Sequence, residues 1–452
     1  MAEKLTNEQQ AAVDSRERSL LVSAAAGSGK TKVLVERLFS YVEREGANLD
    51  DFLIITYTRA AASELRGKIA KALTERMERD PGNYHLRQQM LRVYRADIKT
   101  VDAFCTALLR ENCHLLGEDA RGHALRPDFR VLDENEAQVL RERVLARTLD
   151  DFYDCLTPGG TLLADTLGAG RDDSALEDLV LELHAKLQAQ PYEDKWLEAQ
   201  RAFWRAVPDK IEDTPYGKIL LNEVRRKARH CKNLLQRAAQ EMCANDALNQ
   251  KYAPAFLDAS YQLEALEGKT AEGWDAARGV TIAFPRLAAV KDSDGGEMKA
   301  RMKSLWDNCK ETVKGFAEIF SASSDEAVED LRTMASAMLA LIDLTADFSR
   351  RYNEEKRRRN SADFSDQEHE AIRLLIGEDG APTELARIVS ARYREIMVDE
   401  YQDTNEVQNR IFDAISCKGE NLFTVGDVKQ SIYRFRLPDP RIFLQHYNTW
   451  PP

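Results

Sequence analysis

Residues 24–31 read Ala-Ala-Ala-Gly-Ser-Gly-Lys-Thr. An apolar run, 19–23, precedes this stretch, and a run with helical spacing, 32–42, follows it. The order strand, small-residue loop, helix is typical of a site for phosphate groups, because backbone N–H groups turn inward and the helix presents the positive end of its dipole. The sequence therefore predicts a phosphate-binding loop, and a strand-to-helix turn that binds nothing is the alternative.

Individual residues of this loop favour a nucleoside triphosphate with its metal. Lys30 can reach the β- and γ-phosphates, and the Thr31 hydroxyl can bind Mg²⁺. Ala24 stands where such loops usually begin with glycine, but the later glycines are kept. The residues whose backbone would surround the phosphates are Ala24, Ala25, Ala26, Gly27, Ser28 and Gly29.

Two adjacent carboxylates, Asp399 and Glu400, follow the apolar run 395–398. Open parallel sheets place ligand groups at the carboxyl ends of their strands. We expect Asp399 to hold Mg²⁺ through water and Glu400 to act as the general base toward the attacking water. Alone this pair is an ordinary strand end, but together with Lys30 it predicts a site for phosphoryl transfer.

A glutamine, Gln430, follows a further apolar run, 422–425. Its side chain can form a hydrogen bond to the γ-phosphate or to the attacking water, and the protein could sense hydrolysis in this way. A polar turn at the end of a strand explains the same residue equally well.

The chain changes character along its length. Short β-like runs separated by helix-length stretches occur before residue 110 and after residue 360, at 20–23, 52–56, 98–101, 395–398 and 422–425. The part between them is almost wholly helical, and its clearest element spans 325–359. We therefore expect an α/β fold, in which a parallel sheet flanked by helices (1–110 and 361–452) is interrupted by a large all-helical inserted domain (111–360). A capping-box spacing at 365–368 predicts the start of a helix over 370–376, with a stop at Gly377.

Composition excludes several classes of protein. The seven cysteines form no Cys-x-x-Cys pair, which argues against a disulfide framework or a zinc site. No apolar run is long enough to span a membrane and the N-terminus lacks a signal-peptide pattern, so we expect no membrane contact and a cytoplasmic location. The net charge of −12 is not that of a typical nucleic-acid binder, although 225–227 and 356–359 are local basic runs. Each run can contact DNA or have an ordinary structural role. For 356–359 that role is to place positive charge at the negative, C-terminal end of a long helix.

Five stretches resemble, in order, the N-terminal motifs of UvrD/Rep-like DNA helicases: 5–13, 24–31, 56–65, 398–405 and 425–436. Within this family, 427–436 and 363–366 are most similar to the AddA type, the helicase-nuclease subunit of the bacterial AddAB complex that repairs double-strand breaks. The resemblance covers about 1–110 and 360–445.

The resemblance implies a RecA-like motor domain that uses ATP and Mg²⁺. It makes Gln9 a reader of adenine, although the spacing from Thr6 to Gln9 also fits a capping box. It repeats the roles given above for Lys30, Thr31, Asp399, Glu400 and Gln430. It further implies contacts to single-stranded DNA, where aromatic rings stack on bases, by Tyr57, Thr58, Arg59, Tyr433, Phe435 and Arg436.

The same resemblance sets expectations for partners and completeness. Single-stranded DNA, duplex DNA and an AddB-like subunit in a heterodimer are the expected partners, and the helical insertion either contacts duplex DNA or a partner or is a plain solvated bundle. The second motor lobe, its arginine finger and a nuclease domain do not occur before Pro452. We therefore expect a fragment that binds ATP and Mg²⁺ but hydrolyses ATP poorly alone.

Two functions fit this sequence. The first is the leading motor domain of an ATP-dependent DNA helicase-nuclease that translocates on single-stranded DNA during double-strand-break repair and recombination. The second is a nucleotide-gated binding or regulatory module without turnover. A chromosome-organising or transporter-type ATPase is disfavoured because its Leu-Ser-Gly-Gly signature does not occur in the chain.

Overall fold

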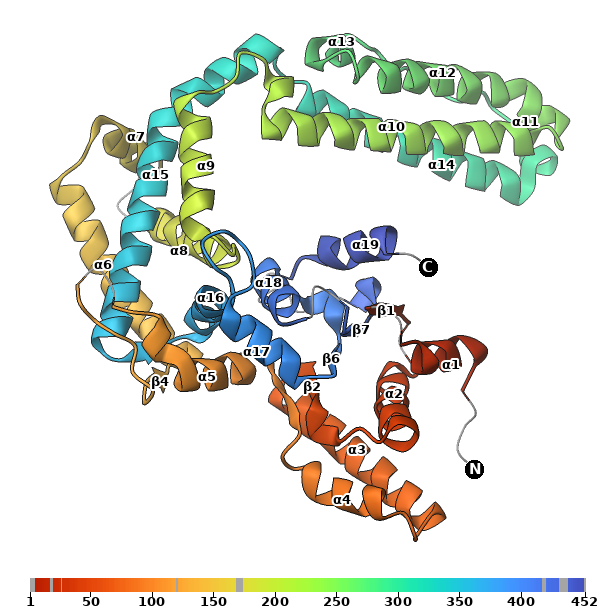
Figure 1. The fold of residues 1–452 in the computed structure, drawn as a ribbon. Helices are drawn as coiled ribbons and strands as arrows, with labels where there is room; N and C mark the ends of the chain where they lie inside the picture. The colour runs from red at the N-terminus through yellow and green to blue at the C-terminus, as the bar shows by residue number, and fades with distance from the viewer. Residues whose placement is uncertain are drawn as a thin grey trace. The chain divides into compact units, whose positions relative to one another are not determined.

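The computed structural model describes residues 5–16, 19–25, 27–118, 121–167, 174–416, 420–430 and 438–450 (Figure 1), without the side chains of 292–295. The chain forms two compact units. The first consists of Met1–Leu156, Leu167–Glu198 and Asp343–Pro452, and the second of Thr157–Thr166 and Ala199–Ile342. The predicted division into 1–110 with 361–452 and an inserted 111–360 stays a prediction. Among the described residues, no helix has both the length and the apolar character to cross a membrane.

The first unit is built on a five-stranded sheet in which every neighbouring pair is parallel. The strand order is β1 (Leu20–Ser23), β7 (Leu422–Gly426), β6 (Glu395–Val398), β2 (Phe52–Thr56) and β3 (Asp97–Thr100). The predicted mixed α/β class with a parallel sheet is confirmed. The strands expected at 20–23, 52–56 and 395–398 have these bounds; β3 starts and ends one residue earlier than expected, and β7 includes one more residue, Gly426.

Both faces of the sheet are covered. Alternate residues of β2 enter two different cores: Phe52 and Ile54 belong to one, and Leu53 and Ile55 to the other. All residues of β2, β6 and β7 are buried, as expected for central strands of a parallel sheet. The first core includes residues of α1 (Asn7–Asp14), α2 (Lys30–Glu45), α3 (Arg59–Arg79) and α4 (Tyr84–Arg92). The second includes residues of α5 (Val101–Asn112), α16 (Phe364–Leu375), α17 (Glu384–Arg392), α18 (Glu406–Ile415) and α19 (Pro440–Thr449).

The first unit also contains the short parallel strand pair β4 (Arg130–Val131) and β5 (Ser361–Ala362), together with further helices. They are α6 (Glu134–Asp154), α8 (Ser174–Gln188) and the later part of α15 (Ser324–Arg358). The long helix predicted over 325–359 is therefore present, displaced by one residue at each end. Short 3-10 turns lie at η1 (Leu49–Asp51), η2 (Cys113–Leu115), η3 (Ile211–Asp213), η4 (Tyr401–Asp403) and η6 (Val428–Gln430).

The start of α16 corrects one prediction. The N-cap is Asp363, whose side chain accepts from Asp366 N at 2.9 Å, while Asp366 Oδ2 accepts from Asp363 N at 2.9 Å. The capping box is therefore formed by these two aspartates and not by 365–368, and the helix begins at Phe364. The physical reason is a contact with the preceding helix: Lys356 Nζ lies 2.8 Å from Asp363 Oδ2 and 2.7 Å from Asp366 Oδ1, so the cap is part of an ion-pair cluster around a buried ammonium.

The second unit is helical. Its helices are α10 (Pro215–Met242), α11 (Asp246–Lys251), α12 (Ala253–Lys269), α13 (Trp274–Arg278) and α14 (Asp292–Ile319), while α7 (Pro158–Leu167), α9 (Glu193–Arg205) and α15 have residues in both units. α10 and α12 pack along each other around a core that includes Phe256 and Trp306, whose rings are stacked 4.8 Å apart.

The two basic runs make contacts within the chain. In 225–227, Arg225 donates to Thr270, and the other two residues pair with Glu223. In 356–359, Lys356 and Arg357 pair with carboxylates of α16 or its cap, and the last two arginines pair with Glu355. These contacts support the structural interpretation of both runs.

Candidate nucleotide-binding site

Two glycines shape the loop between β1 and α2. Gly27 and Gly29 have φ of 73° and 85°, in the left-handed region that glycine adopts without strain. α2 begins directly after the loop, and Gly29 offers no side chain to cap it. The first N–H groups of α2 therefore remain available to an anion such as a phosphate.

Three predicted catalytic residues meet at this loop, although 370 and 400 residues separate Lys30 from Glu400 and Gln430. Lys30 Nζ lies 2.8 Å from Glu400 Oε2 and donates a longer hydrogen bond of 3.4 Å to Gln430 Oε1. The Lys30 side chain is only 9% exposed. The meeting follows from the sheet order, because β1, β7 and β6 are neighbours and all three segments leave their carboxyl ends.

The backbone at the end of β6 is strained. Asp399 N donates to Ile55 O at 3.0 Å and so extends the ladder with β2, whereas Glu400 has a φ of 52°. Left-handed backbone is costly for a residue with a side chain, and such residues concentrate at functional sites. This turn directs the Glu400 carboxylate to Lys30 while Asp399 Oδ1 accepts from Glu400 N at 3.0 Å.

The donor set fits a hard divalent cation. Burial raises the pKa of Asp399 to about 6, and the adjacent Glu400 carboxylate adds to the rise. A cation beside Asp399 would supply the charge that favours its ionised form. The Thr31 hydroxyl and the Asp399 carboxylate are oxygen donors, which Mg²⁺ prefers.

Sequence reasoning missed Gln402, which connects the two halves of the site. This buried side chain donates to Glu400 Oε2 at 2.8 Å and accepts from Asp427 N at 2.8 Å. Asp427 in turn accepts from the Gln430 side chain, so these residues and Lys30 form a closed ring of polar contacts. The sequence did offer one signal for Gln402, which is its position in the motif 398–405, two residues after the proposed general base Glu400.

Comparisons with known proteins identify the family of the chain. The sequence pattern of the UvrD/REP helicase N-terminal domain matches residues 5–451. The chain belongs to this family. The predicted resemblance to UvrD/Rep-like helicases is therefore confirmed.

Individual relatives within the UvrD/Rep family give a more specific likeness. The chain is similar to the AddA-type subunit of the ATP-dependent helicase/nuclease of Desulfitobacterium hafniense, with 38% identity over 478 residues that cover 99% of this chain and 33% of the relative. The corresponding protein of Ruminiclostridium cellulolyticum is 34% identical over 467 residues (99% and 36%), and that of Alkaliphilus oremlandii 36% over 455 residues (98% and 36%). The chain spans about a third of the length of these relatives. The predicted likeness to the AddA type is confirmed.

The first UvrD/Rep motif places Gln9 against the loop. Thr6 Oγ1 accepts from Gln9 N at 3.2 Å and Thr6 N donates to Gln9 Oε1 at 2.9 Å, which confirms the capping box. The other end of the Gln9 amide, Nε2, donates to Ser28 O at 2.8 Å. Both ends of the Gln9 amide are therefore bonded within the chain, although the oxygen keeps a second lone pair and the nitrogen a second hydrogen. The reading of adenine by Gln9 stays a prediction.

The predicted DNA residues of the UvrD/Rep motif at 56–65 differ in exposure. Arg59 is exposed at the start of α3, and Thr58 is the N-cap of that helix, accepting from Ala61 N at 3.0 Å. Tyr57 is buried, and its hydroxyl lies 2.5 Å from Thr404 Oγ1. Stacking of Tyr57 on DNA stays a prediction, and it requires the ring to be uncovered.

Several predicted positions lie outside the described residues. They are Ala26 in the phosphate loop and the DNA-contact residues Tyr433, Phe435 and Arg436. Their roles stay predictions.

Proposed function

We propose that this chain is the ATP-binding first motor domain of an ATP-dependent DNA helicase-nuclease, with a RecA-like sheet and an inserted helical domain. The observation that carries the proposal is the meeting of Lys30, Glu400 and Gln430 at neighbouring strand ends. A structural ion pair alone would not require a strained backbone at Glu400, a glycine loop and a helix N-terminus at one place. Phosphoryl transfer uses all three.

Each residue has a chemical part in this proposal. Lys30 contacts the β- and γ-phosphates of ATP, and Thr31 and Asp399 hold Mg²⁺, which when bound neutralises phosphate charge. Lys30 leaves Glu400 for the phosphates, and the freed carboxylate accepts the proton of the attacking water. Gln430 contacts the γ-phosphate. When hydrolysis removes this phosphate, the ring of polar contacts through Gln402 and Asp427 transmits the change to the turn after β7.

We also propose DNA as the substrate and a second protein as the partner. The exposed Arg59 lies past the end of β2, where a strand of DNA could follow the carboxyl edge of the sheet. The relatives are named as subunits of an ATP-dependent helicase/nuclease, which supports single-stranded and duplex DNA as substrates and an AddB-like partner. Repair of double-strand breaks and recombination are the processes proposed for the complete protein.

The test is ATP hydrolysis by this chain together with any sequence that its gene encodes beyond Pro452. We expect single-stranded DNA to stimulate hydrolysis, because a motor that steps along DNA couples its movement to ATP hydrolysis. Turnover that DNA does not stimulate, with Lys30 intact, would contradict the motor and would favour the nucleotide-gated module instead.

Gln402 provides a separate prediction. In the chain completed with any sequence that its gene encodes beyond Pro452, we expect Gln402→Met to slow DNA-stimulated ATP hydrolysis roughly 10- to 100-fold, because a catalytic group that shifts by about 1 Å loses up to that factor. Affinity for ATP with Mg²⁺ should change by less than about threefold, since Gln402 holds the base and not the phosphates. Steady-state hydrolysis and equilibrium titration of the same preparation measure the two effects.

The matched control is Gln445→Met, on the exposed side of α19. It makes the same chemical change away from the ring and should leave both quantities unchanged. Equal rates in the two variants would show that Gln402 does not position Glu400.

A further inference from the structure

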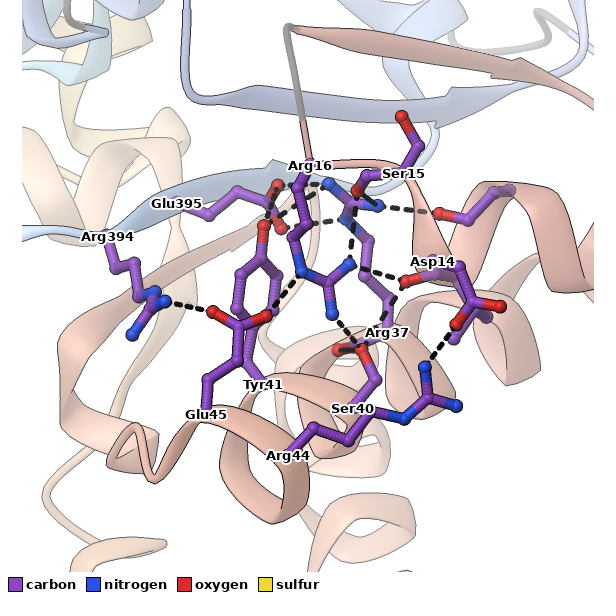
Figure 2. Close-up of polar contacts among 12 residues, drawn as sticks. Asp14, Ser15, Arg16, Arg37, Ser40, Tyr41, Arg44, Glu45, Arg394 and Glu395 are labelled. Carbon is purple, nitrogen blue, oxygen red and sulfur yellow. Dashed lines mark hydrogen bonds and ion pairs between the residues drawn. The ribbon is translucent and has the colours of Figure 1, made fainter.

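A buried ion pair lies at the end of the sheet where the strands begin, opposite the carboxyl ends that carry the candidate nucleotide site. Arg37 of α2 and Glu395, the first residue of β6, are 1% and 5% exposed. Arg37 Nε donates to Glu395 Oε2 at 2.9 Å, and Nη2 donates to Oε1 at 2.5 Å (Figure 2). Tyr41 adds a hydrogen bond of 3.1 Å to Oε1. Two parallel bonds fix the plane of the guanidinium group and therefore the direction of its remaining nitrogen, Nη1.

That remaining nitrogen holds the end of α1. Arg37 Nη1 donates to Ala12 O at 2.6 Å and to Ser15 O at 2.7 Å. Carbonyls in the last turn of a helix have no partner within the helix, so one buried cation satisfies two of them here. Figure 2 shows Arg37 between Glu395 and the Ser15 segment that follows α1.

α1 makes only a small apolar contact with the core, through Val13 and the partly buried Ala12, so its polar contacts add to its positioning. It has eight residues, of which Val13 alone is buried. A helix of this length is marginal without support from its surroundings. Its first turn carries Gln9, whose Nε2 reaches Ser28 O in the phosphate loop at 2.8 Å. The two ends of α1 are thus attached to the two ends of the nucleotide-binding segment, the loop and the second turn of α2.

We propose that Arg37, oriented by Glu395, is a positioning residue that keeps α1 in register with the phosphate loop and so sets the preference of the site for an adenine base. The proposal rests on the proposed function, because the contact of Gln9 with adenine belongs to it. Arg37 itself touches neither base nor phosphate. Loss of Arg37 should therefore affect the base-dependent part of binding and spare the phosphate-dependent part.

The experiment measures dissociation constants of the chain for ATP, for ITP and for inorganic tripolyphosphate, each with Mg²⁺. The main variant is Arg37→Met with Glu395→Gln, because the double change removes the Arg37 contacts to Ala12 and Ser15 without leaving a buried charge unpaired. The Arg16 contact to Val13 O, at 2.6 Å, remains in this variant. We expect ATP to bind about tenfold more weakly, tripolyphosphate to bind as in the parent chain, and the ATP-to-ITP preference to fall toward one.

Two further variants serve as controls. Glu395→Gln alone keeps the Arg37 contacts to Ala12 and Ser15, and we expect it to retain more than half of the base preference. Arg44→Met removes an exposed contact to α1, the 2.6 Å pair with Asp14, and should leave the preference unchanged.

The possible results distinguish a failure of this inference from a failure of the proposed function. If Gln9→Ala abolishes the base preference while the Arg37 double variant keeps it, the inference is overturned and the nucleotide site stands. If Gln9→Ala leaves the preference intact, adenine is not read from α1 and the inference also fails. If the parent chain binds neither ATP nor tripolyphosphate, the proposed function fails and the inference with it. Faster amide hydrogen exchange in α1 of the double variant, together with the lost preference, supports the inference.

Discussion

Lys30→Ala should lower the affinity of the chain for ATP with Mg²⁺ by at least about 100-fold, whereas Glu400→Gln should bind ATP and fail to hydrolyse it. The Lys30 ammonium is largely buried where three strand ends meet, so its contact with phosphate is poorly screened by water. Charged hydrogen bonds of this kind contribute about 1.5–3 kcal/mol each, and about 1.4 kcal/mol corresponds to tenfold in affinity.

The second half of this prediction concerns the rate. Glu400→Gln keeps the size of the side chain but removes the base, and general-base catalysis contributes roughly 10²- to 10⁴-fold. We expect DNA-stimulated hydrolysis to fall within that range while ATP binding stays within about threefold of the parent. The reason is that Glu400 acts on water, not on phosphate.

Equilibrium titration with a fluorescent ATP analogue measures binding, and phosphate release measures the rate. Lys314→Ala is the matched control for Lys30→Ala, because this lysine is 74% exposed on α14 in the other compact unit. Unchanged ATP affinity in Lys30→Ala, or full turnover in Glu400→Gln, would contradict the assignment of these two residues.

Lys356→Met should destabilise the first unit by about 3–5 kcal/mol, the usual cost of leaving buried charges without their partner. The Lys356 side chain is 1% exposed between Asp363 and Asp366. Burial alone would lower the pKa of Lys356, but the two carboxylates outweigh it and raise the pKa overall. Removal of this ammonium leaves the buried Asp363 and the partly buried Asp366 without their cation, and it also disturbs the cap of α16.

Urea unfolding followed by circular dichroism measures this loss, with Lys68→Met as the control. Lys68 also pairs with a carboxylate, Glu64, but the two side chains are 48% and 67% exposed. Such surface pairs contribute about 0.5 kcal/mol or less. Adding Asp366→Asn to Lys356→Met should restore part of the stability, since one unpaired charge is removed. Equal losses in Lys356→Met and Lys68→Met would show that the cluster does not stabilise the fold.

Local patterns predicted much of this fold. The strands at 20–23, 52–56 and 395–398 were found with their observed bounds, because buried parallel strands are short apolar runs with sharp limits. The loop with Gly27 and Gly29 was predicted because its backbone requires glycine. Lys30 and Glu400 were expected to meet because strand ends of one parallel sheet share an edge.

The parts that the sequence did not reveal depend on contacts between elements that form only in the fold. The cap of α16 was misplaced because Asp363 pairs with the buried Lys356 of the preceding helix, and the capping-box pattern does not encode this contact between two helices. Tyr57 is covered through a contact with Thr404, 347 residues later. Gln402 and Arg37 were missed for the same reason, since each bridges segments that only the folded sheet brings together.

The most direct test of the central claim is a crystal structure of this chain with a non-hydrolysable ATP analogue and Mn²⁺ in place of Mg²⁺. We expect an anomalous Mn²⁺ peak beside the Thr31 hydroxyl and the Asp399 carboxylate, with the triphosphate against Lys30. A Mn²⁺ peak and a triphosphate bound away from these residues would contradict this claim.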